Sequence, residues 1–132
     1  PSIEITEERF PFYIPYYELL PDSGGKGQWR GGLGSKVELV YEGSSEARLN
    51  TAGDGIINPP FGLLGGKPGK AHRYSIFSNG RERILNSKET GVPVQPGDSI
   101  VSYASGGGGY GDPNLRDIDS HKEDIKNGYC SE

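Results

Sequence analysis

The sequence PDSGGKGQWRGGLG at residues 21–34 decides how the rest of this chain is arranged. Six of its fourteen residues are glycine, yet it also holds the only tryptophan, Trp29, with an acid at Asp22 and a base at Arg30. Glycine loses more conformational entropy on folding than any other residue, so a cluster of glycines needs a structural reason such as close approach of two backbones. The stretch therefore predicts a shaped loop, and neither a flexible linker nor a core strand.

Two further glycine clusters follow, PPFGLLGGKPGKAH at residues 59–72 and GGGGYGDP at residues 106–113. The three clusters together hold 15 of the 22 glycines in the chain. Glycine is therefore placed at particular positions and is not spread through the sequence. We expect three shaped loops with strands between them.

The best strand pattern is KVELVYE at residues 36–42, which puts Val37, Leu39 and Tyr41 on one face. Asn79-Gly80 predicts a hairpin, because both residues tolerate the positive φ values of a type I′ turn. Weaker patterns predict strands at residues 2–9, 46–55, 73–78, 83–85 and 99–105, a turn at the end of residues 92–98, and a helix only at residues 119–127. We expect a mainly β fold, a single compact β-sandwich or barrel-like domain over residues 1–132, with long glycine-rich loops and a short C-terminal helix.

The composition excludes several classes of partner. The net charge is −4 and the basic residues form no stripe, which argues against nucleic acid. No apolar run approaches the roughly 20 residues of a membrane helix, and no signal-peptide pattern is present. A lone cysteine, Cys130, cannot form an internal disulfide, which fits a reducing compartment. We expect no nucleic-acid or membrane partner and a cytoplasmic location.

The hydrophobic core is expected to be lean. Leu, Ile, Val and Phe number 28 of 132 residues, so part of the stability is expected to come from another chain. An aromatic segment at residues 10–20 is interrupted by two prolines, which exclude a helix interior or a central strand. Its rings either cover the domain's own core or lie in a subunit interface, where aromatic residues are enriched. The predicted interface residues are Phe10, Phe12, Tyr13, Tyr16, Tyr17 and Trp29.

The motifs that carry nucleotide or metal chemistry are incomplete. GGKPGK at residues 65–70 has one residue too few between its glycines for a phosphate-binding loop, and Ala71 stands where a Ser or Thr is required. The ligand-type side chains His72, His121 and Cys130 have no metal-ligand spacing, so no metal site is predicted.

No residue is assigned a catalytic role, and Asp22 and Arg30 are the candidates. The competing interpretation of Asp22, as of Asp98 and Asp112, is turn closing or capping, since all three lie at turn-type positions. The competing interpretation of Arg30 is a salt bridge that ties the loop to a neighbouring element. From the residues alone, the chain is a β-rich domain without a complete catalytic set.

Three long motifs, in the same order, resemble the C-terminal part of the hydantoinase B family. They are YELLPDSGGKGQWRGGLG at residues 17–34, PPFGLLGGKPGK at residues 59–70 and VPVQPGDSIVSYASGGGGYGDPNLRD at residues 92–117. This family includes the B subunits of ATP-dependent hydantoinases, the matching half of 5-oxoprolinase, and subunits of acetone and acetophenone carboxylases. Of these, the chain looks like the small (beta) subunit of acetophenone carboxylase.

The resemblance implies a mainly structural, non-autonomous subunit of an ATP-dependent ketone carboxylase, which converts acetophenone, bicarbonate and ATP to benzoylacetate. The alternative that it implies is a subunit of a hydantoinase or 5-oxoprolinase that hydrolyses a cyclic amide. A third reading from the residues is a free-standing β module that binds a carbohydrate or another ligand through its aromatic segment.

The resemblance also implies partners and cofactors. The expected partners are larger hydantoinase A-type and B-type subunits in a hetero-oligomer, with ATP and Mg²⁺ or Mn²⁺ bound by the A-type partner. No cofactor is expected on this chain, and zinc is possible elsewhere in the complex. If the chain contributes directly, the candidates are Asp22, Arg30 and the backbone N–H groups of Gly106, Gly107, Gly108 and Gly109, which are expected to form an anion-binding nest.

Overall fold

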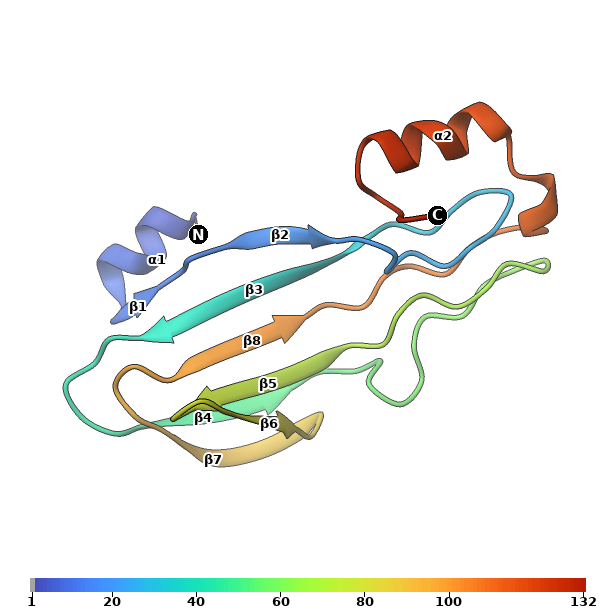
Figure 1. The fold of residues 1–132 in the computed structure, drawn as a ribbon. Helices are drawn as coiled ribbons and strands as arrows, with labels where there is room; N and C mark the ends of the chain where they lie inside the picture. Colours follow the sequence, from blue (N-terminus) through green and yellow to red (C-terminus); the bar gives the residue numbers. More distant parts are fainter. Residues whose placement is uncertain (1) are drawn as a thin grey trace.

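The structure is a computed structural model that describes residues 2–132, and it is mainly β (Figure 1). Its larger sheet has six strands in the order β1-β3-β8-β5-β6, and β2 also pairs with β3. All of these pairs are antiparallel. The strands of this sheet are β1 (Phe12–Tyr13), β2 (Tyr17–Leu20), β3 (Gly34–Tyr41), β5 (Arg73–Ser78), β6 (Arg81–Leu85) and β8 (Ser99–Tyr103).

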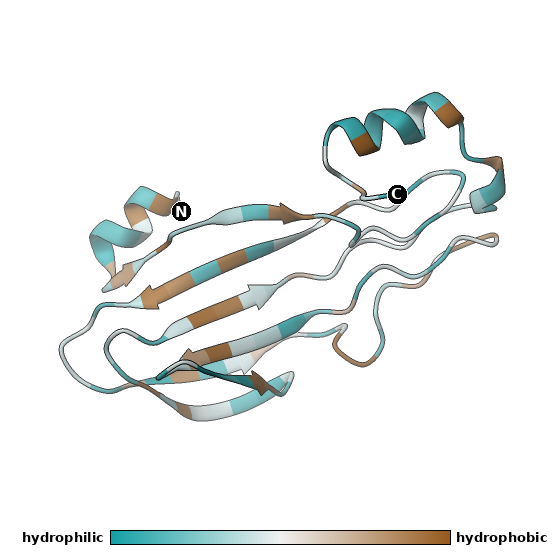
Figure 2. Cartoon of the chain, in the orientation of Figure 1, coloured by the Kyte–Doolittle hydropathy of each residue, from teal (hydrophilic) through white to brown (hydrophobic). Residues whose placement is uncertain are grey.

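A second, two-stranded antiparallel sheet, β4 (Ala47–Ala52) with β7 (Lys88–Val94), packs on one face of the larger sheet. Val92 and Val94 of β7 meet Ile76 of β5 and Ile100 of β8 in the core. The brown bands on these strands in Figure 2 mark apolar residues of this kind. The two layers confirm the sandwich expected from the sequence, and the larger sheet stays open, so the domain is not a closed barrel.

The core is small, as the composition predicts. Its buried cluster consists of six residues, Tyr41, Ile76, Leu85, Val92, Val94 and Ile100. Partly buried Phe12, Ala47, Leu49 and Tyr74 pack around it.

Two turns match their sequence signatures. Asn79 and Gly80 have φ values of 50° and 72° and join β5 to β6, which confirms the predicted hairpin. Gly97 has a φ of 90° and follows Pro96 in the turn before β8, where the Asp98 carboxylate accepts a hydrogen bond from the Gln95 N–H at 2.8 Å. Asp98 therefore closes a turn.

The strand predicted at residues 2–9 is wrong, because this segment is the helix α1 (Ile3–Arg9). Ser2 caps it by accepting a hydrogen bond from the Ile5 N–H, Glu4 lies in its first turn and Arg9 in its last. These end charges suit the helix dipole. The alternation of Ile3 with Ile5 therefore did not mark a sheet face, and α1 has no buried residue.

The strand β7 was not predicted, because only the turn at the end of residues 92–98 was expected there and Pro93 does not fit a central strand. In the structure β7 pairs with β4 alone, and proline is tolerated on such an edge strand. The C-terminal helix was predicted correctly: α2 (Ile118–Lys126) is followed by Gly128 with a φ of 73°. Its N-cap is Asp117, so the helix begins one residue before the predicted start at residue 119. A short 3₁₀ helix, η1 (Pro113–Leu115), precedes it.

Within residues 2–132, which the structure describes, none of the helices has the length and apolar character needed to cross a membrane.

Candidate functional site

The three glycine loops meet at the end of the sheet that lies away from α1 (Figure 1). Backbone hydrogen bonds join each loop to both of the others: Gly25 N–H donates to Gly107 O at 2.8 Å, Lys67 N–H to Lys26 O at 2.7 Å, and Gly109 N–H to Lys67 O at 2.9 Å. The sequence predicted three shaped loops. The structure confirms them and shows that hydrogen bonds between the loops hold each one in place.

The loops approach too closely for side chains, which explains why glycine is concentrated there. A Cβ added at Gly31 would lie well inside 3.0 Å of the carbonyl oxygen of Gly107, and one added at Gly66 would lie equally close to the carbonyl oxygen of Gly109. In both cases the obstacle is backbone, which cannot rotate away as a side chain can. The backbones therefore pack directly on each other.

The anion-binding nest expected at residues 106–109 is not supported by the hydrogen bonding. The N–H groups of Gly106, Gly107 and Gly109 donate to the carbonyl oxygens of Lys70, Gly32 and Lys67, at 3.3, 2.9 and 2.9 Å. Donors that hold neighbouring loops are not available for a ligand. Gly108 also packs closely, since the backbone of Phe61 occupies the position that a Cβ would take. Residues 106–109 therefore hold the loops together.

Arg30 lies in a partly buried ion-pair cluster, centred on the buried Asp124, that ties α2 to the first glycine loop. Its Nε and Nη2 donate to the two carboxylate oxygens of Asp124 at 2.9 and 3.0 Å. Arg116 pairs with the same carboxylate and also donates to the carbonyl oxygen of Gln28 at 3.4 Å. The guanidinium of Arg30 lies 5.4 Å from the centre of the Tyr129 ring. The salt-bridge interpretation of Arg30 is confirmed.

Asp22 holds the end of the chain. Its φ is 57°, and its carboxylate accepts a hydrogen bond from the Ser131 N–H at 2.9 Å, which lowers the pKa of this carboxyl. Its own N–H donates to the carbonyl oxygen of Tyr129 at 3.0 Å. Asp112 likewise caps η1 by accepting from the Asn114 N–H at 2.9 Å. Asp112 therefore has the capping role that was one of the two interpretations. The Asp22 carboxylate instead ties the C-terminal segment to the first glycine loop, which neither interpretation described.

Asp124 and Arg116 were not singled out from the sequence. Asp124 is one of several acids on a short polar helix, and nothing in its spacing separates it from Asp119, which is exposed. Its role depends on α2 folding back over residues 21–34, a contact between positions 94 residues apart. A single sequence carries no local signal for such a contact.

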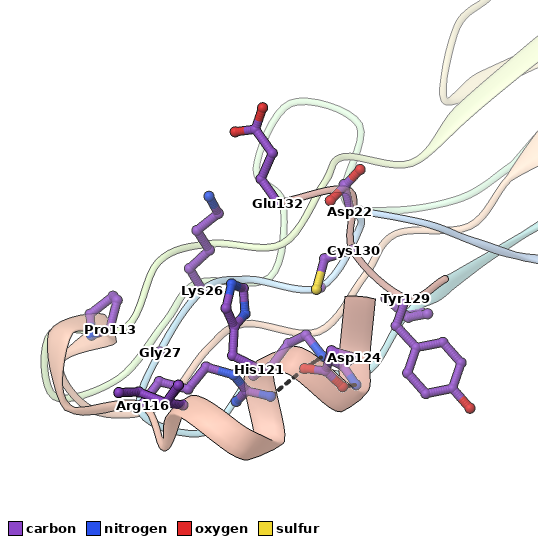
Figure 3. Close-up of a pocket in the computed structure, with 14 residues that line it drawn as sticks. Asp22, Lys26, Gly27, Pro113, Arg116, His121, Asp124, Tyr129, Cys130 and Glu132 are labelled. Atoms are coloured by element: carbon purple, nitrogen blue, oxygen red, sulfur yellow. Dashed lines mark hydrogen bonds and ion pairs between the residues drawn. The ribbon is translucent and has the colours of Figure 1, made fainter. Parts of the chain in front are cut away.

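A cavity of about 390 Å³ lies between residues 21–34 and α2 (Figure 3). Lys26, His121 and Cys130 contribute to its wall, together with Arg30 and Ile118. Burial raises the pKa of the Cys130 thiol, which keeps it protonated and a poor nucleophile.

His72 does not reach this cavity. Its ring packs edge-on against Tyr74 at 4.4 Å, and burial lowers the pKa of its imidazole. His121 and Cys130 share the cavity wall, but within residues 2–132 no three His, Cys, Asp or Glu side chains are grouped as metal ligands.

The aromatic residues predicted at an interface divide into two groups. Phe12 packs on the domain's own core, 5.8 Å from the Tyr41 ring, and Tyr16 lies under the Lys36 ammonium at 4.5 Å. The others are exposed over at least half of their surface: Phe10, Tyr13, Tyr17 and Trp29. The first group covers this domain, and the second remains an interface prediction.

The low pKa of Asp124 predicts acid sensitivity. The Arg30 hydrogen bond holds the pKa of this carboxyl below its usual value of about 4, against the opposing effect of burial. Its contribution to stability is therefore complete above the pKa of the unfolded chain and is lost as the pH falls through the lower pKa of the folded chain. Urea unfolding at a series of pH values is expected to show the advantage of the native chain over Asp124→Asn shrinking below about pH 4. An advantage that does not change with pH would contradict this account of the cluster.

Known proteins share both the sequence and the fold. Residues 1–113 match the family described as Hydantoinase B/oxoprolinase. The caprolactamase subunit beta of Pseudomonas jessenii is 34% identical over 98% of this chain and 23% of its own length. The crystal structure of ATP-dependent caprolactamase from Pseudomonas jessenii superimposes with a TM-score of 0.85 at 30% identity, over 98% of this chain and 23% of that one.

The nucleotide-free structure of acetone carboxylase superimposes with a TM-score of 0.80 at 22% identity, over 100% of this chain and 22% of that chain. At this identity the match shows the fold alone. This chain thus spans about a fifth of the length of these caprolactamase and acetone carboxylase chains.

Proposed function

Because this chain belongs to the hydantoinase B/oxoprolinase family, we propose that it is a structural component of an ATP-dependent enzyme that hydrolyses a cyclic amide. The similarity to caprolactamase, in sequence and in fold over nearly the whole chain, carries this proposal. This similarity favours cyclic-amide hydrolysis, which the sequence resemblance implied as the alternative, over ketone carboxylation.

A structural role for this chain agrees with the contacts of its polar residues. Arg30 is engaged with Asp124, and Asp22 with Ser131, so both catalytic candidates hold the C-terminal segment. The glycine loops are held by main-chain hydrogen bonds. These contacts support a rigid module that presents a fixed surface to catalytic parts of the enzyme.

Partners of the hydantoinase A and B types would complete the enzyme. The A-type partner would bind ATP with Mg²⁺ or Mn²⁺, and any zinc would lie outside this chain. The exposed residues Phe10, Tyr13 and Tyr17 of the aromatic segment would contact one of these partners. Use of ATP and the lone Cys130 support a cytoplasmic location.

Ketone carboxylation is the second candidate. The motifs at residues 17–34, 59–70 and 92–117 resemble those of ketone carboxylase subunits, and the fold is shared with acetone carboxylase over the whole chain. In this case acetophenone, bicarbonate and ATP would yield benzoylacetate.

ATP turnover by the assembled complex separates the two candidates. We expect caprolactam, hydantoin or 5-oxoproline to stimulate ATP hydrolysis at least about tenfold without bicarbonate, a change of about 1.4 kcal/mol in barrier. Acetophenone and acetone, each with bicarbonate, serve as the comparison. Stimulation by a ketone that depends on bicarbonate, with no response to any cyclic amide, would overturn the amide proposal in favour of the carboxylase.

A further inference from the structure

Trp29, Leu63 and Tyr110 form an exposed row at the point where the three glycine loops meet. Trp29 pairs with Tyr110 in an antiparallel bridge, and Leu63 pairs with Tyr110 in a parallel bridge. Directly paired residues present their side chains on the same face. Trp29 is 66% exposed, so the largest side chain in the molecule faces solvent at a site built from backbone.

The backbone under this row is fixed. Trp29 and Tyr110 exchange both of their N–H to carbonyl hydrogen bonds at 2.9 Å, and Leu63 is bonded on either side of Tyr110, to Gly109 and Gly111, at 2.9 Å. A Cβ added at Gly27 would collide with the backbone of Tyr110, so the first and third glycine loops lie in direct backbone contact here. Anchors on such a frame lose little entropy on binding, which favours affinity.

The backbone conformation of Leu64, the residue after Leu63, is a second observation that points to a binding role. Its φ is 48°, in the left-handed region, which is unusual for a bulky residue and costs of order 1 kcal/mol or more. It is 74% exposed, so burial within this chain does not offset the strain. Asparagine or glycine would adopt this conformation more easily. An apolar side chain is therefore held outward at an energetic cost.

We propose that Trp29, Phe61, Leu63, Leu64 and Tyr110, here called the tip cluster, dock on an apolar surface of a larger hydantoinase B-type subunit. The inference rests on the proposed function, since it names the partner of the same complex. All five residues are exposed, Phe61 most of all.

The relatives indicate this occupant. In the caprolactamase and acetone carboxylase chains, the region matched by this domain is about a fifth of the polypeptide, and the other four fifths belong to the same chain. In these relatives the matched domain occurs together with that larger part of the polypeptide. A B-type subunit that supplies the same larger part is therefore the partner that we infer for the tip cluster. Trp and Tyr are also the residue types most enriched at the energetic centre of protein interfaces.

A small molecule fits the tip cluster less well. Ligand sites are concave, and the cavity of about 390 Å³ beside α2 is lined by none of the five tip residues. The cluster carries no charged group that would fix a polar ligand. A flat or shallow apolar partner surface matches its chemistry better.

Trp29 reports on this interface directly, because it is the only tryptophan in the chain. The chain would be labelled with 5-fluorotryptophan and examined alone and in complex with unlabelled hydantoinase A-type and B-type partners. Two measurements would be made on each sample: the ¹⁹F NMR spectrum, and the quenching of tryptophan fluorescence by acrylamide. We expect a shifted ¹⁹F resonance and at least about fivefold weaker quenching in the complex, as a desolvated interface centre requires. Equal quenching in the free chain and in an assembled complex would overturn the proposal.

Leu64→Asn separates binding from folding. Asparagine relieves the left-handed strain and removes a side chain that is not buried, so the circular dichroism and thermal unfolding of the chain are expected to be preserved or improved. The dissociation constant of the complex is expected to rise about tenfold. Ile84→Asn on β6 is the matched control, since Ile84 is also exposed and lies outside the cluster, and it is expected to leave affinity within about twofold. Equal losses for the two variants would overturn the proposal.

The remaining outcomes also distinguish this proposal from the proposed function. Protection of Trp29 in a complex that shows no substrate-dependent ATP turnover would support the interface and refute the function. Substrate-dependent ATP turnover in a complex where Trp29 is still exposed would support the proposed function and refute the interface. Protection of Trp29 in the chain alone, with dimers seen by sedimentation, would assign the cluster to a second copy and overturn the proposal.

Discussion

Gly31→Ala is expected to lower the free energy of unfolding by about 3 kcal/mol or more, at the upper end of what overpacking costs. The added Cβ would lie well inside 3.0 Å of the carbonyl oxygen of Gly107, at the point where the first and third glycine loops cross. Relief requires the two backbones to move apart, which strains the neighbouring hydrogen bond from Gly107 N–H to Gly32 O. Urea unfolding followed by circular dichroism measures the change.

Gly32→Ala is the matched control. It changes the adjacent residue in the same way, but no atom lies within 4 Å of the added Cβ and its φ is outside the left-handed region. We expect its effect on the free energy of unfolding to stay within about 0.5 kcal/mol. If the two alanines cost the same, close backbone packing is not the reason for the glycine clusters.

Asp124→Ala is expected to cost about 3 kcal/mol, because it leaves two arginines without the carboxylate that they share. Arg30 and Arg116 are both largely buried beside it and would have to reach solvent or draw α2 away from the loop. Hydrogen exchange is expected to become faster in α2 and in residues 21–34 together, with the sheet β3, β8 and β5 unchanged.

The control on the same helix is Asp119→Ala. Asp119 is exposed and pairs only with Lys122 three residues later, an interaction worth a few tenths of a kcal/mol. Exchange in α2 that responds equally to both changes would mean that helix propensity, and not the ion-pair cluster, holds the C-terminal segment.

Local patterns predicted the elements whose environment is set by near neighbours. The alternation in residues 36–42 predicted β3, Asn79-Gly80 predicted the hairpin, and the pattern of residues 119–127 predicted α2. The strand predicted at residues 2–9 was wrong because two isoleucines two positions apart were read as a sheet face, whereas the Ser2 cap and the end charges favour a helix.

The arrangement of the site could be predicted only in part. Glycine clustering indicated that the loops are shaped, but their contact with one another depends on pairs such as Gly31 with Gly107, which no spacing in the sequence marks. The same is true of Arg30 with Asp124. Sequence patterns report which residues need a special environment, and the fold decides which distant residue supplies it.

The central claim is that this chain supports an ATP-dependent amide-hydrolysing complex without contributing catalytic side chains. Turnover of the complex carrying Arg30→Ala, normalised to the amount of assembled complex, tests it most directly. We expect less complex to assemble, because the Asp124 contact is lost, while kcat per assembled complex stays within about threefold of the native value. Normal assembly with kcat reduced by about a hundredfold or more would contradict the claim and place Arg30 in the chemistry.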